Sequence, residues 1–303
     1  MSSGLEVRGV SFSYPGGEGA LDGLSLAFPK GGRHAVLGAN GAGKSTLFLL
    51  LNGVLRPSSG QVCFEGEPLC YSRSGLQRIR SRVGILFQDP DAQLLSASIL
   101  EDVSFGPMNL GLPPAVVRQR VEEALSATGL EALAHRPVHA LSFGQKRRVG
   151  IAGLLAMKPD YLILDEPSAG LDRRSCEDFF GLLETLHRQG VTIILSTHSV
   201  DLAHAWADTV VLLKEGRLAA SCEAPDFARG FLAIAQQGWE LPLVVQLHQA
   251  LSQRGLLPPA AGPVPRNPAE LLGLISRLEP STACLAAPGS AAPAPPVGAG
   301  PGG

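Results

Sequence analysis

Residues 38–46 read "GANGAGKST", and this stretch decides how the chain folds and what it binds. It fits the pattern G-x-x-x-x-G-K-[ST], follows an apolar run that starts at Arg33, and opens the apolar segment "KSTLFLLLNGVL". A glycine-rich turn between a strand and a helix lets backbone N–H groups close around a phosphate, and the helix dipole adds positive potential. We therefore expect a nucleoside-triphosphate site lined by Gly38, Asn40, Gly41, Ala42, Gly43, Lys44, Ser45 and Thr46.

Two of these side chains are expected to work with a pair of acids further along the chain. Lys44 would place its positive charge near the β- and γ-phosphate oxygens, and the Ser45 hydroxyl would ligate Mg²⁺. The motif "YLILDEP" at residues 161–167 supplies two acids at the end of a buried strand. We expect Asp165 to reach Mg²⁺ and Glu166 to polarise a water molecule for attack on the γ-phosphate. The alternative is an acidic strand end that caps the next element.

Polar side chains end two further apolar strands. Gln88 closes "VGILFQ" and His198 closes "VTIILSTH". Taken singly, each of these residues is more often structural. Neighbouring parallel strands, however, deliver their carboxyl ends to one crevice, so both would lie near Lys44 and Asp165. We therefore interpret Gln88 and His198 as sensors of the γ-phosphate, with Gln88 also a candidate ligand of Mg²⁺ beside Ser45 and Asp165.

The order of strands and helices predicts an α/β fold with a P-loop nucleotide-binding core. Short β-rich runs alternate with helical segments, which favours a largely parallel sheet with an antiparallel N-terminal portion. Residues 90–157 break this alternation and are expected to form an inserted helical subdomain. We expect a nucleotide-binding domain at residues 1–228, a small C-terminal extension at 229–285, and a disordered Pro/Ala/Gly-rich tail at 286–303.

The composition argues against several classes of function. The net charge of −2 gives no overall attraction to nucleic acid, and the basic run at residues 146–148 lacks interleaved aromatic side chains. We interpret that run as a solvated or salt-bridged helix face. No window holds the roughly eighteen uninterrupted apolar residues that a membrane span needs. The scattered cysteines indicate reduced thiols, and the lack of a Cys-x-x-Cys pair argues against a zinc site.

A second candidate anion site lies at residues 141–145, "LSFGQ". Ser142 and Gln145 have the spacing of a capping box at a helix start, and the small Gly144 leaves backbone N–H groups there accessible. The chain already has a phosphate site, so these residues alone do not say what the second one is for. The bulky Phe143 in the middle of the stretch is also unexpected.

The order of these motifs resembles that of the ATP-binding cassette (ABC) family over residues 4–225. It runs from Tyr14 through "GANGAGKST", Gln88, "LSFGQ", "LILDEP" and "SAGLD" to His198. The resemblance implies that two cassettes pair head to tail, each closing over ATP held mainly by the other. In such a pair Ser142, Gly144 and Gln145 would serve the ATP of the partner.

The resemblance also implies a role for each remaining candidate residue. Tyr14 would stack on the adenine, and Gln88 would couple the nucleotide to the helical subdomain. Glu166 would act as general base while His198 holds the γ-phosphate. Asp172, at the end of "SAGLD", would link the two sites across the pair.

Two longer stretches narrow the resemblance to the ATPase subunits of energy-coupling-factor importers, and most closely to their cobalt/nickel branch. These stretches are residues 83–112 and 141–172. The segment at 229–285 is similar to an extension of that group that helps two copies associate. Phe143 stands where the broader family usually has Gly, and bulky residues at this position are familiar in the metal-importing branch.

On this resemblance the chain is expected to hydrolyse ATP as the motor subunit of an importer, peripherally on the cytoplasmic face of the membrane. The expected cofactors are ATP and Mg²⁺. The expected partners are a second cassette, as a homodimer, and integral-membrane permease subunits, with no nucleic acid. Two alternatives remain. One is an importer ATPase for a vitamin or another small solute; the other is a soluble ABC ATPase in translation or DNA repair.

Overall fold

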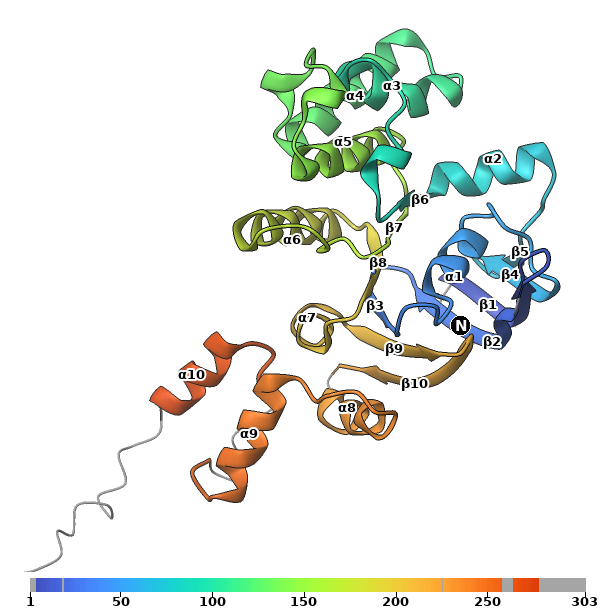
Figure 1. Ribbon diagram of the computed structural model, residues 1–303. Helices are drawn as coiled ribbons and strands as arrows, with labels where there is room; N and C mark the ends of the chain where they lie inside the picture. Colours follow the sequence, from blue (N-terminus) through green and yellow to red (C-terminus); the bar gives the residue numbers. More distant parts are fainter. Residues whose placement is uncertain (1–3, 18, 225, 258–263, 278–303) are drawn as a thin grey trace, which may run out of the picture.

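A parallel sheet forms the centre of the computed structural model, which describes residues 4–17, 19–224, 226–257 and 264–277 (Figure 1). In spatial order its strands are β10 (Arg217–Glu223), β9 (Thr209–Lys214), β3 (Arg33–Leu37), β8 (Thr192–Thr197), β7 (Tyr161–Leu164) and β6 (Val83–Leu86). Only β10, at one edge, pairs antiparallel within this described sheet. Strands β7 and β8 are buried along their whole length, which is typical of parallel strands covered on both faces.

An antiparallel sheet packs beside the parallel one. Its strands, in spatial order, are β2 (Gly19–Pro29), β1 (Gly4–Ser13), β4 (Ser59–Phe64) and β5 (Glu67–Pro68). Helix α1 (Lys44–Leu51) joins the two sheets, because its Leu47 and Phe48 share one hydrophobic core with Val7 of β1 and Ile194 of β8. The parallel core with an antiparallel N-terminal portion confirms the expected fold class.

Helices α6 (Arg173–Arg188) and α7 (Val200–Trp206) pack in a second hydrophobic core on the parallel sheet. Phe179 of α6 is buried there, among side chains of the central strands. Helix α2 (Arg73–Arg82) lies between β5 and β6 in the chain and is not predicted by the sequence pattern. Its segment is polar, and Ile79 is its only buried residue.

The chain inserts a helical subdomain between β6 and β7, drawn above the sheets in Figure 1. Its helices are α3 (Ile99–Asn109), α4 (Pro114–Thr128) and α5 (Phe143–Ala156), with short 3₁₀ turns at Pro90–Ala92, Glu131–Leu133 and Val138–Ala140. The subdomain has a hydrophobic core of its own, to which Val103, Val121 and Val149 each contribute from a different helix. The "LSFGQ" stretch ends at the first turn of α5, so packing within this subdomain determines where that stretch lies.

Among the described residues, three helices follow β10: α8 (Phe227–Gln236), α9 (Leu243–Gln253) and α10 (Pro268–Ser276). Phe231 and Ile234 of α8 are fully buried in the core of the parallel sheet. A division of the chain at residue 228 therefore cuts a helix that packs with the nucleotide-binding domain, whereas a boundary after Gln236 keeps that helix whole. Residues 278–303, which include the tail expected at 286–303, lie outside the described residues.

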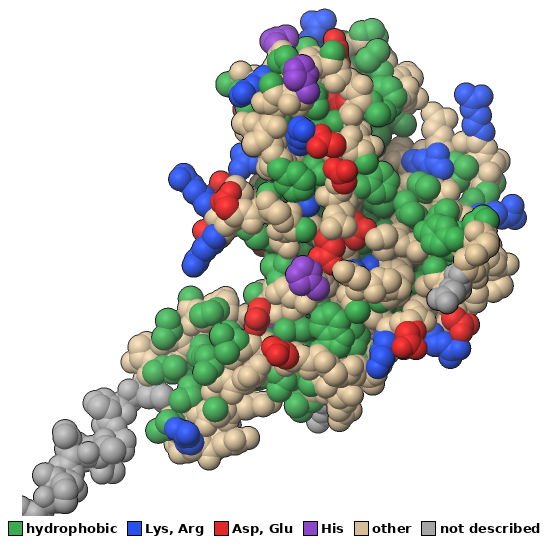
Figure 2. Space-filling view, viewed as in Figure 1, with side chains coloured by type: hydrophobic (Ala, Val, Ile, Leu, Met, Phe, Trp, Pro, Cys, Tyr) green, Lys and Arg blue, Asp and Glu red, His purple; other side chains and the backbone are tan. Residues whose placement is uncertain are grey.

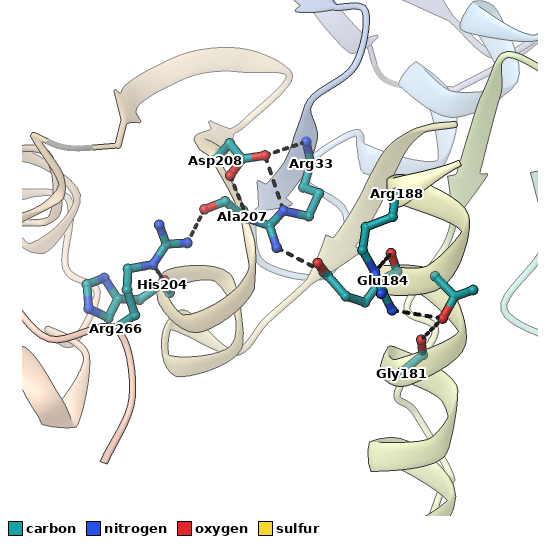
Figure 3. Close-up of polar contacts among 9 residues, drawn as sticks. Arg33, Gly181, Glu184, Arg188, His204, Ala207, Asp208 and Arg266 are labelled. Carbon is teal, nitrogen blue, oxygen red and sulfur yellow. Dashed lines mark hydrogen bonds and ion pairs between the residues drawn. The ribbon is translucent and has the colours of Figure 1, made fainter. Parts of the chain in front are cut away.

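A polar network attaches the segment before α10 to the rest of the fold (Figure 3). Arg266 donates hydrogen bonds to the carbonyl oxygen of His204, at 2.8 Å, and to that of Ala207. Beside them Asp208 accepts a hydrogen bond of 2.7 Å from Arg33 at the start of β3. The segment before α10 is thus held by hydrogen bonds to the end of α7 and to the residue that follows it.

Candidate functional site

The phosphate loop is shaped by a glycine and a buried lysine. Gly43, the residue before α1, has φ of 101°, and a Cβ there would lie 2.6 Å from the carbonyl oxygen of Ala20. Only glycine tolerates both conditions. The side chain of Lys44 is nearly buried, and its Nζ donates to the carbonyl oxygens of Gly38 at 2.7 Å and Ala39 at 3.2 Å. The loop therefore holds a positive charge at the start of a helix, where an anion binds best.

The first acid after β7 lies between two hydroxyls. Ser45 Oγ donates to one carboxylate oxygen of Asp165 at 2.5 Å, and Ser196 Oγ donates to the other at 2.5 Å. Hydroxyl and carboxylate oxygens are the hard ligands that Mg²⁺ prefers, so Ser45 and Asp165 fit this ion. The sequence does not single out Ser196, because it is one small polar residue within the buried run of β8.

The second acid lies between a lysine and a histidine. Glu166 Oε1 is 3.6 Å from Lys44 Nζ, and Oε2 is 3.1 Å from His198 Nδ1. The backbone N–H of Glu166 donates to Ser196 Oγ at 2.8 Å, and its φ of 46° is in the left-handed region. A nearly buried carboxylate in this position can accept a proton from a water molecule beside the phosphate loop.

These groups share one cavity of about 760 Å³. Its lining brings Tyr14, Gln88 and His198 together with residues 39–46 and the two acids, as the sequence predicts. The Tyr14 hydroxyl lies 3.2 Å from Thr46 Oγ1. Figure 2 shows acidic side chains gathered near the centre of the molecular face, between the helical subdomain and the sheets.

The "LSFGQ" residues lie in a different cavity. Ser142 Oγ accepts a hydrogen bond of 3.3 Å from the Gln145 N–H, and Gln145 Oε1 accepts one of 3.0 Å from the Ser142 N–H, which confirms the capping box. Ser142, Gly144 and Gln145 line a smaller cavity of about 160 Å³ with Arg148 and part of α6, and they do not line the phosphate cavity. The structure therefore does not bring this loop to the phosphate loop of its own chain.

Asp172 lies beside the smaller cavity as the N-cap of α6. Its carboxylate accepts hydrogen bonds from the backbone N–H of Ser175 at 2.9 Å and from the Ser175 hydroxyl at 2.7 Å. These bonds favour the charged form and lower the pKa of the Asp172 carboxyl group. The observed contacts of Asp172 are thus those of a helix cap at the rim of the smaller cavity.

The interpretation of residues 146–148 as a solvated or salt-bridged face is right for two residues and wrong for the third. Lys146 pairs with Asp91 at 2.5 Å, and Arg148 pairs with Asp178 at 3.4 Å. Arg147 is instead 1% exposed, because α5 packs this side chain against the turn that follows β7. The sequence could not reveal this burial, since it depends on how the subdomain meets the sheet.

The fold and this cavity define a class of protein. A glycine-rich loop between a parallel strand and a helix, with a buried lysine and adjacent acids at the strand ends, is the site of a P-loop nucleoside triphosphatase. Residues 21–169 match the model of the ABC transporter family.

Two curated relatives place the chain within the family. The cobalt import ATP-binding protein CbiO of Rhodobacter capsulatus is 51% identical over 243 residues, which cover 80% of this chain and 87% of that protein. The energy-coupling factor transporter ATP-binding protein EcfA2 of Methanospirillum hungatei is 42% identical over 271 residues, which cover 89% of this chain and 68% of that protein. The chain therefore belongs to the ABC transporter family, among the ATP-binding subunits of energy-coupling factor transporters, and it is an ATP hydrolase.

Solved structures agree with this assignment. CbiO1 from Clostridium perfringens, part of the ABC transporter complex CbiONQ, is 43% identical with a TM-score of 0.70 and covers 82% of this chain and 100% of that chain. The ATP-binding cassette MJ0796, solved as a dimer in a post-hydrolysis state with ADP and Pi, is 26% identical with a TM-score of 0.65. It covers 72% of this chain and 98% of that chain.

Proposed function

We propose that the chain is the ATP-hydrolysing subunit of an importer for cobalt or nickel ions and works as a pair of identical cassettes on membrane permease subunits. The position of Glu166 between Lys44 and His198 in the phosphate cavity carries the hydrolytic part of the proposal. The cobalt import relative at 51% identity supports the choice of metal ions as cargo. The metal would pass through the permease, since the described residues hold no cluster of three His, Cys, Asp or Glu side chains suited to bind it.

The proposed mechanism assigns one task to each residue. Residues 38–46 and the charge of Lys44 bind the β- and γ-phosphates of ATP. Ser45 and Asp165 would hold Mg²⁺, whose charge offsets that of the phosphate oxygens, with Gln88 beside them. Glu166 accepts the proton of the attacking water.

His198 and Tyr14 complete the proposed site beside Glu166. Through its contact with Glu166, His198 would orient the carboxylate and would also bind the γ-phosphate. The side chain of His198 is 73% exposed, so it can meet the nucleotide directly. Tyr14, which is partly exposed at the cavity edge, offers its ring to the adenine.

The second anion site serves a second copy in this proposal. Ser142 and Gly144 lie in a cavity of their own, so the phosphate they meet is the one held by the partner. Asp172, at the rim of that cavity, would link the two sites. The dimeric MJ0796 cassette supports pairing as a property of such folds. Exposed leucines on α9 and α10, within the hydrophobic area at the lower end of Figure 2, suit a further contact between the copies.

The permease would dock in the groove beside the Gln88 segment. A cavity of about 680 Å³ lies between α2 and the helical subdomain, lined by apolar side chains such as Leu76, Phe105 and Leu154 together with Arg73 and Arg80. None of the helices in the described part of the chain has the length and hydropathy to cross a membrane. We place the chain peripherally, on the cytoplasmic face of the membrane, because its relatives are named as ATP-binding subunits of transporters, with transport supplied by the permease.

The substitution Glu166→Gln tests the hydrolytic role. It keeps the shape of the side chain but removes its basicity, so hydrolysis should fall by about 10²–10⁴-fold while ATP binding persists. A stable ATP-loaded dimer should accumulate, as size-exclusion chromatography with ATP would detect. The matched control is Glu177→Gln on α6, an exposed acid whose one ion pair within the described part of the chain is with Arg173; this change should leave turnover unchanged. Near-normal turnover of Glu166→Gln would reject Glu166 as the base.

A second cargo class is favoured by one observation. The energy-coupling factor relative from Methanospirillum hungatei covers more of this chain than the cobalt import relative, and its name specifies no solute. A vitamin or another small solute is therefore the alternative cargo. Uptake of radiolabelled Ni²⁺ and Co²⁺ by the reconstituted complex separates the two. The relatives are transporter subunits, which argues against the alternative in translation or DNA repair.

A further inference from the structure

Arg147 is a buried charge with an unusual set of partners. Its guanidinium donates to the carbonyl oxygens of Gln88 at 3.2 Å and Glu166 at 3.3 Å, and also to that of Pro167. None of the ion pairs among the described residues includes it, and burial lowers the pKa of its guanidinium. A buried charge without a carboxylate is costly, so this arginine needs an explanation other than stability.

The side chain that covers Arg147 is the unexpected Phe143. The guanidinium carbon of Arg147 lies 4.8 Å from the centre of the Phe143 ring, within the range of a cation–π contact. The same ring lies against Gly170 of "SAGLD", where a Cβ would be 3.3 Å from a ring carbon. Phe143 thus fills the space between the start of α5 and the loop after β7.

The backbone that Arg147 holds is strained. Glu166 has φ of 46°, which a residue with a side chain seldom adopts. Ser196 binds the N–H of Glu166, while Arg147 binds its carbonyl oxygen and that of Pro167. The turn is therefore held on both sides, and its conformation directs the Glu166 carboxylate toward Lys44 and His198.

We propose that Arg147, covered by Phe143, is a positioning residue for Glu166. It ties the first turns of α5 to the catalytic turn and to the Gln88 segment, so the position of the "LSFGQ" loop is transmitted to the base of the same chain. A partner nucleotide that seats Ser142 then also secures Glu166. The inference rests on the proposed function, because it takes Glu166 to be the general base.

The test is the substitution Arg147→Met in the full-length chain. Methionine fills much of the volume but cannot bind the three carbonyl oxygens. Since a small misplacement of a catalytic group is costly, kcat for ATP hydrolysis should fall about tenfold or more, while KM for ATP stays within about twofold. The control is Arg120→Met in α4, which also removes an arginine that donates to a carbonyl oxygen, that of Met157 at 3.3 Å. A smaller fall in kcat, or a fall matched by Arg120→Met, would overturn the proposal.

A double-mutant measurement separates positioning from general loss of structure. In single-turnover hydrolysis the double variant of Arg147→Met and Glu166→Gln should be no slower than Glu166→Gln alone, because the arginine acts through that base. Additive losses would overturn the role of Arg147 and leave the proposed function intact. Near-normal hydrolysis by Glu166→Gln would instead reject Glu166 as the general base, which is the part of the proposed function on which this inference rests. If Arg147→Met does not fold, Arg147→Lys, which keeps the charge but not the fork of donors, is judged by the same criteria.

Discussion

In the proposed mechanism, Glu166 is the residue on which the chemistry of the site depends. The residue is 8% exposed and its carboxylate lies between Lys44 and His198, so few other side-chain orientations are available to it. Its backbone is held by Ser196 on one side and Arg147 on the other. The residue is therefore preorganised before any nucleotide arrives, which is the condition under which a general base is most effective.

Tyr14 allows a prediction about nucleotide binding. The ring is 43% exposed at the edge of the phosphate cavity, and its hydroxyl bonds only to Thr46 among the described residues. If the ring stacks on adenine, Tyr14→Ala should weaken ATP binding by about 1–2 kcal/mol, or roughly 5- to 30-fold. Tyr14→Phe keeps the ring and should bind within about twofold of the parent.

Calorimetric titration with ATP in the Glu166→Gln background measures both variants without hydrolysis. A Tyr14→Ala variant that binds as tightly as Tyr14→Phe would show that the ring does not contact the base. A similar loss of ATP affinity in both variants would show that Tyr14 contributes through its hydroxyl and the bond to Thr46.

Most residues of the phosphate cavity could be predicted because they lie at the ends of apolar runs. Lys44, Asp165 and His198 each follow a buried strand, and parallel strands bring such residues together. Ser196 and Arg147 could not be predicted, for different reasons. Ser196 is hidden within a buried strand, and Arg147 looks like its two exposed neighbours until the position of α5 is known.

Helix α5 combines two tasks at its first turn. Ser142 caps the helix within its own chain, and in our proposal it also meets the phosphate of the partner. Substituting aspartate for Ser142 distinguishes helix capping from phosphate binding, because aspartate is as good an N-cap as serine but its negative charge repels a phosphate. Ser142→Asp should therefore change the free energy of unfolding by less than about 0.5 kcal/mol. Hydrolysis should fall by about 10²-fold, as expected for like charges a few ångströms apart.

The matched control for this element is Ser98→Asp. Ser98 caps α3 with the same capping box, in which Glu101 takes the place of Gln145. The substitution Ser98→Asp should leave both the stability of the fold, measured by thermal unfolding, and ATP hydrolysis, measured by phosphate release, nearly unchanged. Full activity of Ser142→Asp would show that the start of α5 does not contact the phosphate of the partner's ATP.

The elements that the sequence predicts are those with strong apolar patterns, such as β7, β8 and α1. Helix α2 and strand β5 escape prediction because one is polar and the other is two residues long. Both form through their neighbours: Ser72 caps α2, and β5 pairs with β4. The sequence pattern also does not assign α8 to a domain, because that assignment depends on the burial of this helix against the parallel sheet.

In our proposal the whole molecule contributes one half to each of two composite sites. Its phosphate cavity contains the loop, the acids and His198, whereas the capped loop of α5 opens elsewhere. The segment before α10 is fixed to this body through Arg266, so a contact between two copies made at α10 would orient the body of each copy. This arrangement suits a molecule whose activity requires a second copy.

Mixing two inactive variants measures this central claim directly. Lys44→Ala removes the phosphate contact of a chain's own site, and Ser142→Arg removes its contribution to the partner. In a mixed pair one composite site carries both defects and the other carries neither. Equal mixing should therefore restore about a quarter of the parental ATPase rate, because about half of the pairs are mixed. A mixture no more active than its separate components would contradict the account.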